Sequence, residues 1–263
     1  MSARSGAEPF GSRRAVRIGA PILFGLVVLA LWQGVVTALH ILPFVLPSPL
    51  AIGTQFGLRA PFVLNSSLIT AGNALIGLLI GTLLAAIFAA LAASVRAIDQ
   101  LSAPLATAAS VIPIVALAPA LYTMFGADQQ TARVLIAAIA AFVPIYFNTL
   151  RGLRTVQPIH RDLMRSYAAS SWQATRTVTL PGALPYFFTG VRIAAALAVI
   201  SSLIAEDFGG PINGLGTSIT SAVSSSNYPL AWAFVVGAII TGLVFYCGVL
   251  AVEGVATWRR SSP

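Results

Sequence analysis

Long apolar runs with few charged residues constrain this chain more than any other feature. Only 8% of its 263 residues are charged, whereas soluble globular domains carry about 25%. A backbone in lipid must satisfy its own hydrogen bonds, so an apolar run of about 20 residues predicts a membrane-spanning helix. We therefore predict an all-α integral membrane protein with six spans: Ile18–Leu39, Leu68–Ala93, Leu101–Phe125, Ala132–Leu150, Tyr186–Ala205 and Pro229–Ala256.

The six spans leave room for one membrane domain and none for a soluble domain. We predict a polar cytoplasmic tail over residues 1–17, a single transmembrane domain over 18–258 and a short cytoplasmic end over 259–263. A basic start before an apolar run also occurs in signal peptides. The first run is longer than a signal core and no clean small-x-small cleavage site follows it, so an uncleaved first span is preferred.

The placement of arginines predicts the orientation. All 15 basic residues are Arg, and the formal net charge is +8. Such a charge could indicate nucleic-acid binding, but these residues cluster beside the spans, which is the pattern of cytoplasmic loops. With both termini cytoplasmic, only Arg59 and Arg133 fall outside. The sequence thus predicts a multi-pass protein of the cytoplasmic (inner) membrane, surrounded by lipid and without a nucleic-acid partner.

Small residues line one face of the second span. Asn73, Gly77, Gly81, Ala85 and Ala89 recur at every fourth position. Such a face lets another helix approach closely, so we predict that it packs against a neighbouring span.

Three prolines interrupt the third span, namely Pro104, Pro113 and Pro119. Each removes a backbone donor from a helix interior, so we expect this span to be kinked or discontinuous. Two segments are predicted outside the membrane, namely His40–Asn65 with a short interfacial helix over Leu50–Leu58 and the turn 126–130. The Gly- and Ser-rich segment Phe208–Asn227 is predicted to be either re-entrant or external.

The polar stretch Asp162–Pro185 separates the fourth and fifth spans. Its Ser, Thr, Gln and Arg residues exclude lipid as its solvent, while apolar residues recur through it. We predict a helix over His160–Ser170, a turn at Ser170–Ser171 and a second helix over Trp172–Leu180. Such a helical elbow suggests a docking surface for a soluble partner, and a merely solvated loop is the alternative.

This stretch resembles the cytoplasmic coupling loop of permease subunits of bacterial ATP-binding-cassette importers. The motif of that family is Glu-Ala-Ala, three residues, Gly, nine residues, Ile, one residue, Leu-Pro. The aligned positions here are Asp162 for Glu, Leu163 and Met164 for the two Ala, Ala168 for Gly, Val178 for Ile, and Leu180-Pro181 for Leu-Pro. Ala168 in place of Gly puts the sharp turn in doubt and favours its displacement to Ser170–Ser171.

Further motifs resemble the subgroup for sulfonates, nitrate, taurine and thiamine precursors. They are Leu46-Pro-Ser-Pro49, Met124-Phe-Gly126, Ala169-Ser-Ser-Trp-Gln173, Leu180-Pro-Gly-Ala-Leu-Pro185 and Gly190-Val-Arg192. Phe208-Gly-Gly-Pro211 and Asn227-Tyr-Pro-Leu-Ala-Trp232 look most like the vitamin-precursor branch.

The resemblance implies a type I importer permease that moves a small solute, such as a vitamin precursor, a sulfonate or a nitrate-like ion, by alternating access. It also implies a homodimer, separate ATPase subunits that bind ATP and Mg²⁺, and an external solute-binding protein. No cofactor is implied for this chain itself.

The resemblance and the polar residues of the spans give two sets of candidate site residues. The coupling loop, about residues 155–185, is expected to contact the ATPase through Asp162, Arg165, Tyr167, Ala168, Trp172, Leu180 and Pro181. Polar and ionisable residues in spans are functional candidates. The translocation candidates are Asn73, Pro113, Tyr146, Asn148, Glu206 and Asp207, the last two being alternatively a solvated helix end. Arg192 can snorkel to the inner surface, and Glu253 is either a functional candidate or a partner of Arg259 or Arg260.

Two other functions are left open by the residues alone. A proton-coupled secondary transporter without an ATPase would carry its proton on Glu206 or Asp207, but the chain is small and has no evident inverted repeat. An intramembrane enzyme would need a catalytic constellation, and the sequence has no HExxH, GxSxG or paired His. Its single cysteine, Cys247, offers no disulfide or metal cluster. Because the chain has no P-loop and no Lys, any ATP must be hydrolysed by another subunit.

Overall fold

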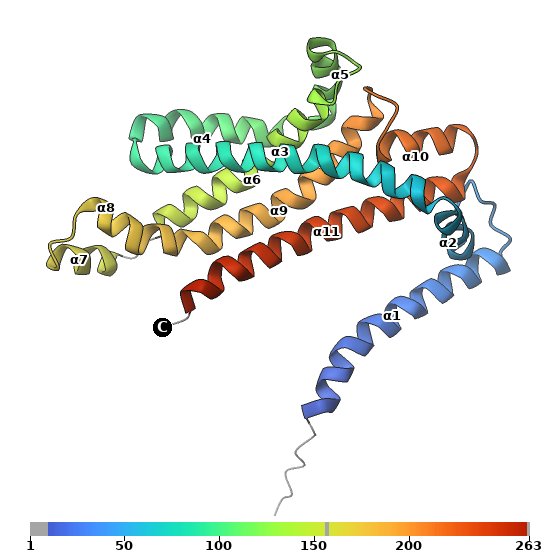
Figure 1. Ribbon diagram of the computed structural model, residues 1–263, viewed down its shortest axis with the longest axis horizontal. Coiled ribbons are helices and arrows are strands. Elements are labelled where there is room, and N and C mark those ends of the chain that lie inside the picture. The colour runs from blue at the N-terminus through green and yellow to red at the C-terminus, as the bar shows by residue number, and fades with distance from the viewer. Residues whose placement is uncertain (1–9, 156–157, 262–263) are drawn as a thin grey trace, which may run out of the picture.

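The computed structural model describes residues 10–155 and 158–261, and all of the regular elements in these ranges are helices (Figure 1). The elements in chain order are α1 (Phe10–Ala38), α2 (Pro49–Leu58), α3 (Ala60–Ser94), α4 (Arg96–Val111), α5 (Ile114–Phe125), α6 (Thr131–Arg154), α7 (Pro158–Ser166), α8 (Ser171–Ala174), the π-helical turn η1 (Thr175–Thr179), α9 (Leu180–Asp207), α10 (Leu215–Ser224) and α11 (Tyr228–Ser261).

Among the described residues, five helices are long and apolar enough to cross a membrane. They are α1, α3, α6, α9 with its preceding turns, and α11. The bent pair α4–α5 is a sixth candidate when it is counted as one broken span. The all-α class with six spans, predicted from the apolar runs, is confirmed.

Tight contacts between small residues hold α3, α6 and α9 together. Asn73, Gly77, Gly81, Ala85 and Ala89 are all buried, which confirms the predicted packing face of α3. A methyl group on Gly77 would lie 2.5 Å from Cβ of Ala137 and 2.8 Å from the carbonyl oxygen of Val134.

Gly190 of α9 also lies against the backbone of α6. Its added methyl group would lie 2.9 Å from Cα of Ile145 and 3.0 Å from the carbonyl oxygen of Pro144. Glycine lets helices approach backbone to backbone, which gains van der Waals contact where lipid offers no hydrophobic driving force. The core of the molecule is therefore this α3–α6–α9 layer.

The predicted third span is broken at one of its three prolines. Helix α4 ends at Val111, Ile112 and Pro113 are extended, and α5 leaves at 105°. Pro104 and Pro119 lie inside α4 and α5. Figure 1 shows α4 running back beside α3 while α5 turns away from it.

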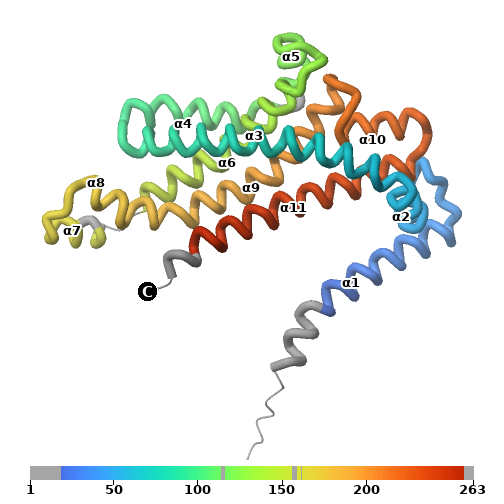
Figure 2. The backbone as a smooth tube through the Cα atoms, in the orientation of Figure 1, coloured from blue at the N-terminus to red at the C-terminus, as the bar shows by residue number. Residues whose placement is uncertain are grey.

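The largest departure from the sequence-based helices concerns the fifth span. The segments α8, η1 and α9 form one continuous helical rod from Ser171 to Asp207, which Figure 2 traces as an unbroken coil. The prediction ended a separate elbow helix at Leu180. Pro181 does not end the helix because a wider π-helical turn precedes it and Pro181 occupies the first turn of α9, where its missing N–H is tolerated.

Several smaller boundaries also differ from the prediction. Helix α3 begins at Ala60, so residues 60–65 are helical instead of extending the outer segment, whereas α2 matches the predicted interfacial helix. Helix α1 begins at Phe10, within the predicted polar tail, and residues 1–9 lie outside the described part. Helix α11 continues to Ser261, into the predicted cytoplasmic end, of which residues 262 and 263 are not described.

Helix α1 stands apart from the rest of the molecule (Figure 1). It touches the other helices near its C-terminal end, where Trp32 meets Trp232 with ring centroids 5.7 Å apart. There the side-chain oxygen of Gln33 also accepts a hydrogen bond from the backbone N–H of Leu50 at 3.1 Å. Almost none of its spanning residues are buried, so the described residues leave its apolar surface largely uncovered.

Candidate functional site

The elbow, residues 158–181, projects beyond the ends of α4 and α6 at one end of the molecule (Figure 1). Helices α2 and α10 lie at the opposite end (Figure 1). Helix α7 forms the first arm of the elbow, and α8 begins the rod that continues as α9. A displacement of the elbow would therefore be carried into the membrane region by α9.

The turn between the two arms keeps the position that the family motif gives it. Ala168 has φ of +51°, in the left-handed region. The N–H of Ala168 donates to the carbonyl of Arg165 at 2.9 Å, and that of Ala169 to the carbonyl of Met164 at 3.0 Å. These two bonds form a Schellman motif, which ends a helix with a left-handed residue. The expected displacement of the turn to Ser170–Ser171 is wrong, because Ala168 adopts the left-handed conformation even without being glycine.

Ser170 starts the second arm instead of forming a turn. Its hydroxyl accepts a hydrogen bond from the N–H of Gln173 at 3.3 Å, and the side chain of Gln173 accepts one from the N–H of Ser170 at 2.7 Å. This reciprocal capping box satisfies two backbone donors that a helix start leaves free. The Ser-Ser pair of the sequence is therefore a helix cap.

Large apolar side chains of the elbow lie exposed at its surface. Tyr167 is 76% exposed and Trp172 is 67% exposed. Ile159, Leu163 and Leu180 are also exposed, and Pro181 is half-buried. An apolar surface with this much aromatic area is typical of a protein–protein interface.

The charged pair of α7 is also exposed. Asp162 Oδ1 lies 3.6 Å from Nη1 of Arg165, as predicted for residues three apart, and the two side chains are 70% and 83% exposed. Exposed ion pairs of this kind stabilise a fold by about 0–1 kcal/mol. Both charges therefore remain available to a docking partner.

The predicted translocation residues do not form one site. Tyr146 is fully buried, and its hydroxyl lies 2.6 Å from the Ser102 hydroxyl, which joins α6 to α4. Asn148 donates to the carbonyl of Pro144 at 2.7 Å within its own helix. Pro113 lies exposed at the α4–α5 break, and Asp207 is exposed at the end of α9. Asn73 and Glu206 belong to a polar network at the end of the molecule that carries α10.

Glu206 holds the start of α10. Its carboxylate is 1% exposed and accepts hydrogen bonds from the Thr70 hydroxyl, at 2.8 and 3.0 Å, and from the N–H of Gly216 at 2.8 Å. The Thr70 hydroxyl in turn accepts from the N–H of Leu215 at 2.9 Å. A negative charge at a helix N-terminus is favoured by the unpaired N–H groups there.

Gly214 makes the approach of Glu206 possible. It has φ of +91°, and an added methyl group would lie 2.5 Å from the carboxyl carbon of Glu206. Within a span, this acid therefore ties α9 to α3 and α10.

Arg133, to which the sequence analysis gave no role beyond an outer position, is the centre of the same network. Its side chain is fully buried and is surrounded by acceptors from α5, α6 and the α9–α10 loop. They are the hydroxyl of Tyr122 (3.2 Å), Oε1 of Gln130 (2.9 Å), Oδ1 of Asn213 (2.7 Å), and the carbonyls of Gly209 (3.4 Å), Pro211 (2.7 Å) and Asn213 (3.2 Å).

Asn73 extends this network to α3 by donating to Oε1 of Gln130 at 2.9 Å. A signal for it was present in the sequence, because Arg133 is a charge two residues inside an otherwise apolar span. Most of its partners could not be predicted, since Gly209, Pro211 and Asn213 belong to a loop about 80 residues away. The arrangement fixes the α9–α10 loop firmly at this end of the molecule.

Comparisons with known proteins agree with these features. The family model described as the binding-protein-dependent transport system inner membrane component matches residues 77–259. The riboflavin transport system permease protein RibX of Chloroflexus aurantiacus is 36% identical over 93% of this chain and 91% of its own length. The formylaminopyrimidine transport permease protein ThiX of Halalkalibacterium halodurans is 27% identical over 94% of this chain and 99% of its own.

A solved structure has the same fold. The crystal structure of an amino acid ABC transporter with histidines superposes with a TM-score of 0.62, at 16% identity, over 75% of this chain and 95% of that one. The matched family region contains the whole elbow, α6 and α9, and α3 from Gly77 onward.

Proposed function

Because the chain belongs to the inner-membrane components of binding-protein-dependent transport systems, the permease subunits of ATP-driven importers, we propose that two copies of it form the pathway of such an importer. The membership favours ATP as the energy source over a proton gradient. The ATPase subunits, which bind ATP and Mg²⁺, would be separate chains, since this chain has no P-loop. When the ATPases close on ATP, the elbow would move with them and the spans would open outward to accept solute.

The exposed aromatic residues of the elbow carry the proposal that it docks on the ATPase. Aromatic side chains dominate the binding energy of interfaces. Tyr167 is 76% exposed and Trp172 is 67% exposed. Leu180 and Pro181 continue this surface to the base of α9, and Ala168 sets the angle between the arms. Asp162 and Arg165 supply charges beside the apolar anchors.

Co-purification of the permease with its ATPase tests this docking surface. We expect Tyr167→Ala to weaken ATPase binding by about tenfold or more, as truncation of an interface anchor does, and to abolish uptake. Asp162→Arg is expected to do the same without unfolding the chain, since the exposed Asp162–Arg165 pair stabilises it by about 1 kcal/mol at most.

Phe44→Ala is the matched control, because Phe44 is an aromatic residue 60% exposed in the segment between α1 and α2. Normal co-purification and normal uptake in both elbow variants would show that the elbow is only a solvated loop.

The detached helix α1 supports a homodimer. Two apolar cavities of about 600 and 700 Å³ lie between α3 and α11. They form one groove, because both are lined by Leu68, Ala71, Val244 and Phe245. We propose that α1 of a second copy covers this groove, while lipid covers the remaining apolar surface. Cysteines at Gly25 and Leu75 would then form cross-linked dimers in membranes, and the absence of such dimers would contradict this pairing.

The predicted pathway residues divide into two groups by exposure. We infer that Asp207 and Pro113, which are exposed, are the better candidates for lining a path, and that Asn73, Tyr146 and Glu206 hold helices together. Asn148 is half-buried and belongs to neither group. Asp207→Asn is therefore expected to lower uptake at normal assembly, whereas Glu206→Gln is expected to lower the stability of the chain. The reverse pattern would return Glu206 to the path.

Relatives suggest the solute. RibX is a permease of a riboflavin transport system and ThiX one for formylaminopyrimidine, so we propose that the solute is a vitamin or a vitamin precursor, delivered by an external solute-binding protein. Uptake of labelled riboflavin and of a labelled aliphatic sulfonate by cells that express the whole system would separate the two main classes. Sulfonate uptake alone would contradict the proposal.

We further propose that both termini and the elbow lie in the cytoplasm, as the arginine distribution indicates. The chain itself would carry out no chemical step.

A further inference from the structure

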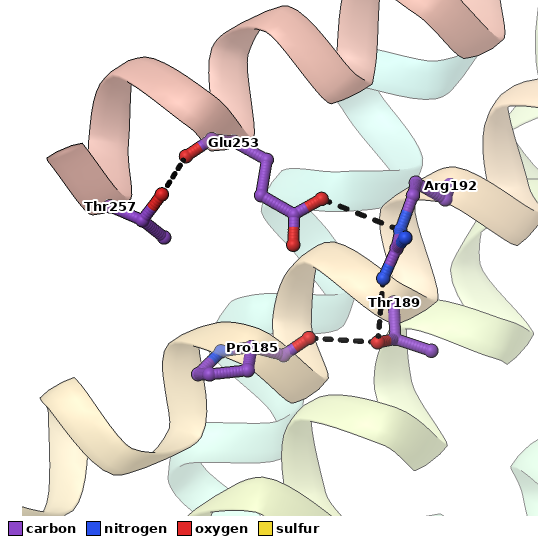
Figure 3. Close-up of polar contacts among 5 residues, drawn as sticks. All are labelled: Pro185, Thr189, Arg192, Glu253 and Thr257. Carbon is purple, nitrogen blue, oxygen red and sulfur yellow. Dashed lines mark hydrogen bonds and ion pairs between the residues drawn. The ribbon is translucent and has the colours of Figure 1, made fainter. Parts of the chain in front are cut away.

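Arg192 of α9 and Glu253 of α11 form an ion pair inside the membrane-spanning part of the molecule (Figure 3). Nε of Arg192 lies 3.4 Å from Oε2 of Glu253, and the side chains are 32% and 20% exposed. The sequence indicates that Arg192 can reach the inner surface, and in the structure its side chain turns toward α11. Glu253 was expected to pair with Arg259 or Arg260, whose side chains lie outside the described residues.

The pair continues as a polar chain along α9. Nη2 of Arg192 donates to the hydroxyl of Thr189 at 3.3 Å, and that hydroxyl donates to the carbonyl of Pro185 at 2.8 Å (Figure 3). Pro185 lies within the first two turns of α9, which follow directly from the elbow. The chain of contacts therefore reaches from the last span to Pro185 in α9, four residues beyond the end of the elbow.

Within the described parts of α9 and α11, this pair is the one ion pair that joins the two helices, and Phe245 and Val249 of α11 pack against the apolar core. Val191 and Val252, the neighbours of Arg192 and Glu253, line the cavity of about 700 Å³ that separates α11 from α3. The ion pair thus joins the inner half of α11 to α9 at the edge of this apolar cavity.

Stability alone does not account for charges at this place. Desolvation of two ions offsets most of their attraction, so an apolar pair of similar size often stabilises a protein as well or better. An ion pair does fix one relative placement of two helices, because its geometry is satisfied only at one register.

We propose that Arg192 and Glu253 are positioning residues for transport, which make α11 follow α9 when the ATPase displaces the elbow. The inference depends on the proposed docking of the elbow on an ATPase. A displaced elbow moves α9 because α8, η1 and α9 are one rod, and α11 moves with α9 only while the pair holds their register.

The test is uptake per ATP hydrolysed by the complete complex of permease, ATPase and binding protein in proteoliposomes. Arg192→Glu and Glu253→Arg are each expected to lower this ratio by about tenfold, a coupling within the range for contacting charges, at normal co-purification of the ATPase. The exchanged double variant Arg192→Glu with Glu253→Arg is expected to restore the ratio to within about twofold, as a double-mutant cycle requires of a direct pair.

An apolar double variant, Arg192→Met with Glu253→Leu, distinguishes two roles of the pair: holding α9 and α11 at one register, and merely keeping the two helices in contact. It should keep the stability of the chain and still lower uptake per ATP. Full coupling in the apolar variant, unchanged coupling in both single variants, or no recovery in the exchanged variant would each overturn the inference. If the wild-type complex shows no ATP-dependent uptake, the importer proposal itself fails. If the wild-type complex takes up solute normally and the variants do so with the same uptake per ATP, only the inference about the ion pair fails.

Discussion

Replacement of Ala168 by glycine should make the elbow more rigid. Ala168 has φ of +51° at the end of α7, and the left-handed conformation costs an L-residue about 1–2 kcal/mol. Glycine removes that cost but loses about 0.5–1 kcal/mol more conformational entropy on ordering. The difference predicts that Ala168→Gly stabilises the turn by about 0.5–1 kcal/mol.

Hydrogen exchange measures this change where it occurs. The N–H groups of Tyr167, Ala168 and Ala169 are all bonded to carbonyls of α7, at 3.2, 2.9 and 3.0 Å. If the free energy of local opening rises by about 0.5–1 kcal/mol, the exchange of these N–H groups slows by about two- to fivefold. The control is Ala169→Gly, because Ala169 does not have a positive φ and glycine there should speed exchange. Faster exchange in Ala168→Gly would refute the assignment of a left-handed turn at this position.

Two other predictions concern the opposite end of the molecule and its orientation. Gly214→Ala should destabilise the chain by about 2–3 kcal/mol, because its backbone conformation is accessible essentially to glycine alone and its Cβ would lie 2.5 Å from the carboxyl carbon of Glu206. The measurement is thermal unfolding, and the control is Gly182→Ala, whose added methyl group has nothing within 4 Å and should not lower stability. Equal losses of stability in both variants would show that the clash with Glu206 is not the cause. Ser226→Cys should react with an impermeant thiol reagent from outside, and Ser171→Cys only after the membrane is opened. Both serines are exposed; Ser171 begins α8 and Ser226 lies between α10 and α11, and α8 and α10 are at opposite ends of the molecule (Figure 1). The reverse labelling would overturn the cytoplasmic placement of the elbow.

The spans and their packing face could be predicted because few solutions exist in lipid. An apolar run must be helical to satisfy its backbone, and a stripe of small residues must face another helix to fill space. The stripe from Asn73 to Ala89 was therefore located correctly from its spacing alone.

The breaks and joints could not be predicted, since they depend on tertiary context. Three prolines occupy the third span, yet only Pro113 breaks it, and Pro181 lies in a continuous rod. Alanine at position 168 is not itself a signal of a left-handed turn, which favours glycine, and the only indication of the turn there was the alignment of Ala168 with the Gly of the family motif.

Buried polar networks were hidden for a related reason. The burial of Arg133 and Glu206 depends on a loop that folds back over them and supplies carbonyl and N–H groups. Sequence spacing carries no information on such contacts. The pairing of Arg192 with Glu253 likewise joins residues of different spans and could be found only in the folded chain.

The central claim, that this chain is the permease of an ATP-driven importer, is tested most directly by solute uptake into proteoliposomes. The vesicles would contain the permease with its ATPase, and the binding protein loaded with labelled riboflavin would be added outside. We predict accumulation that requires ATP, Mg²⁺ and the binding protein and that persists when a protonophore collapses the proton gradient. Accumulation driven by an imposed pH gradient without the ATPase would contradict it.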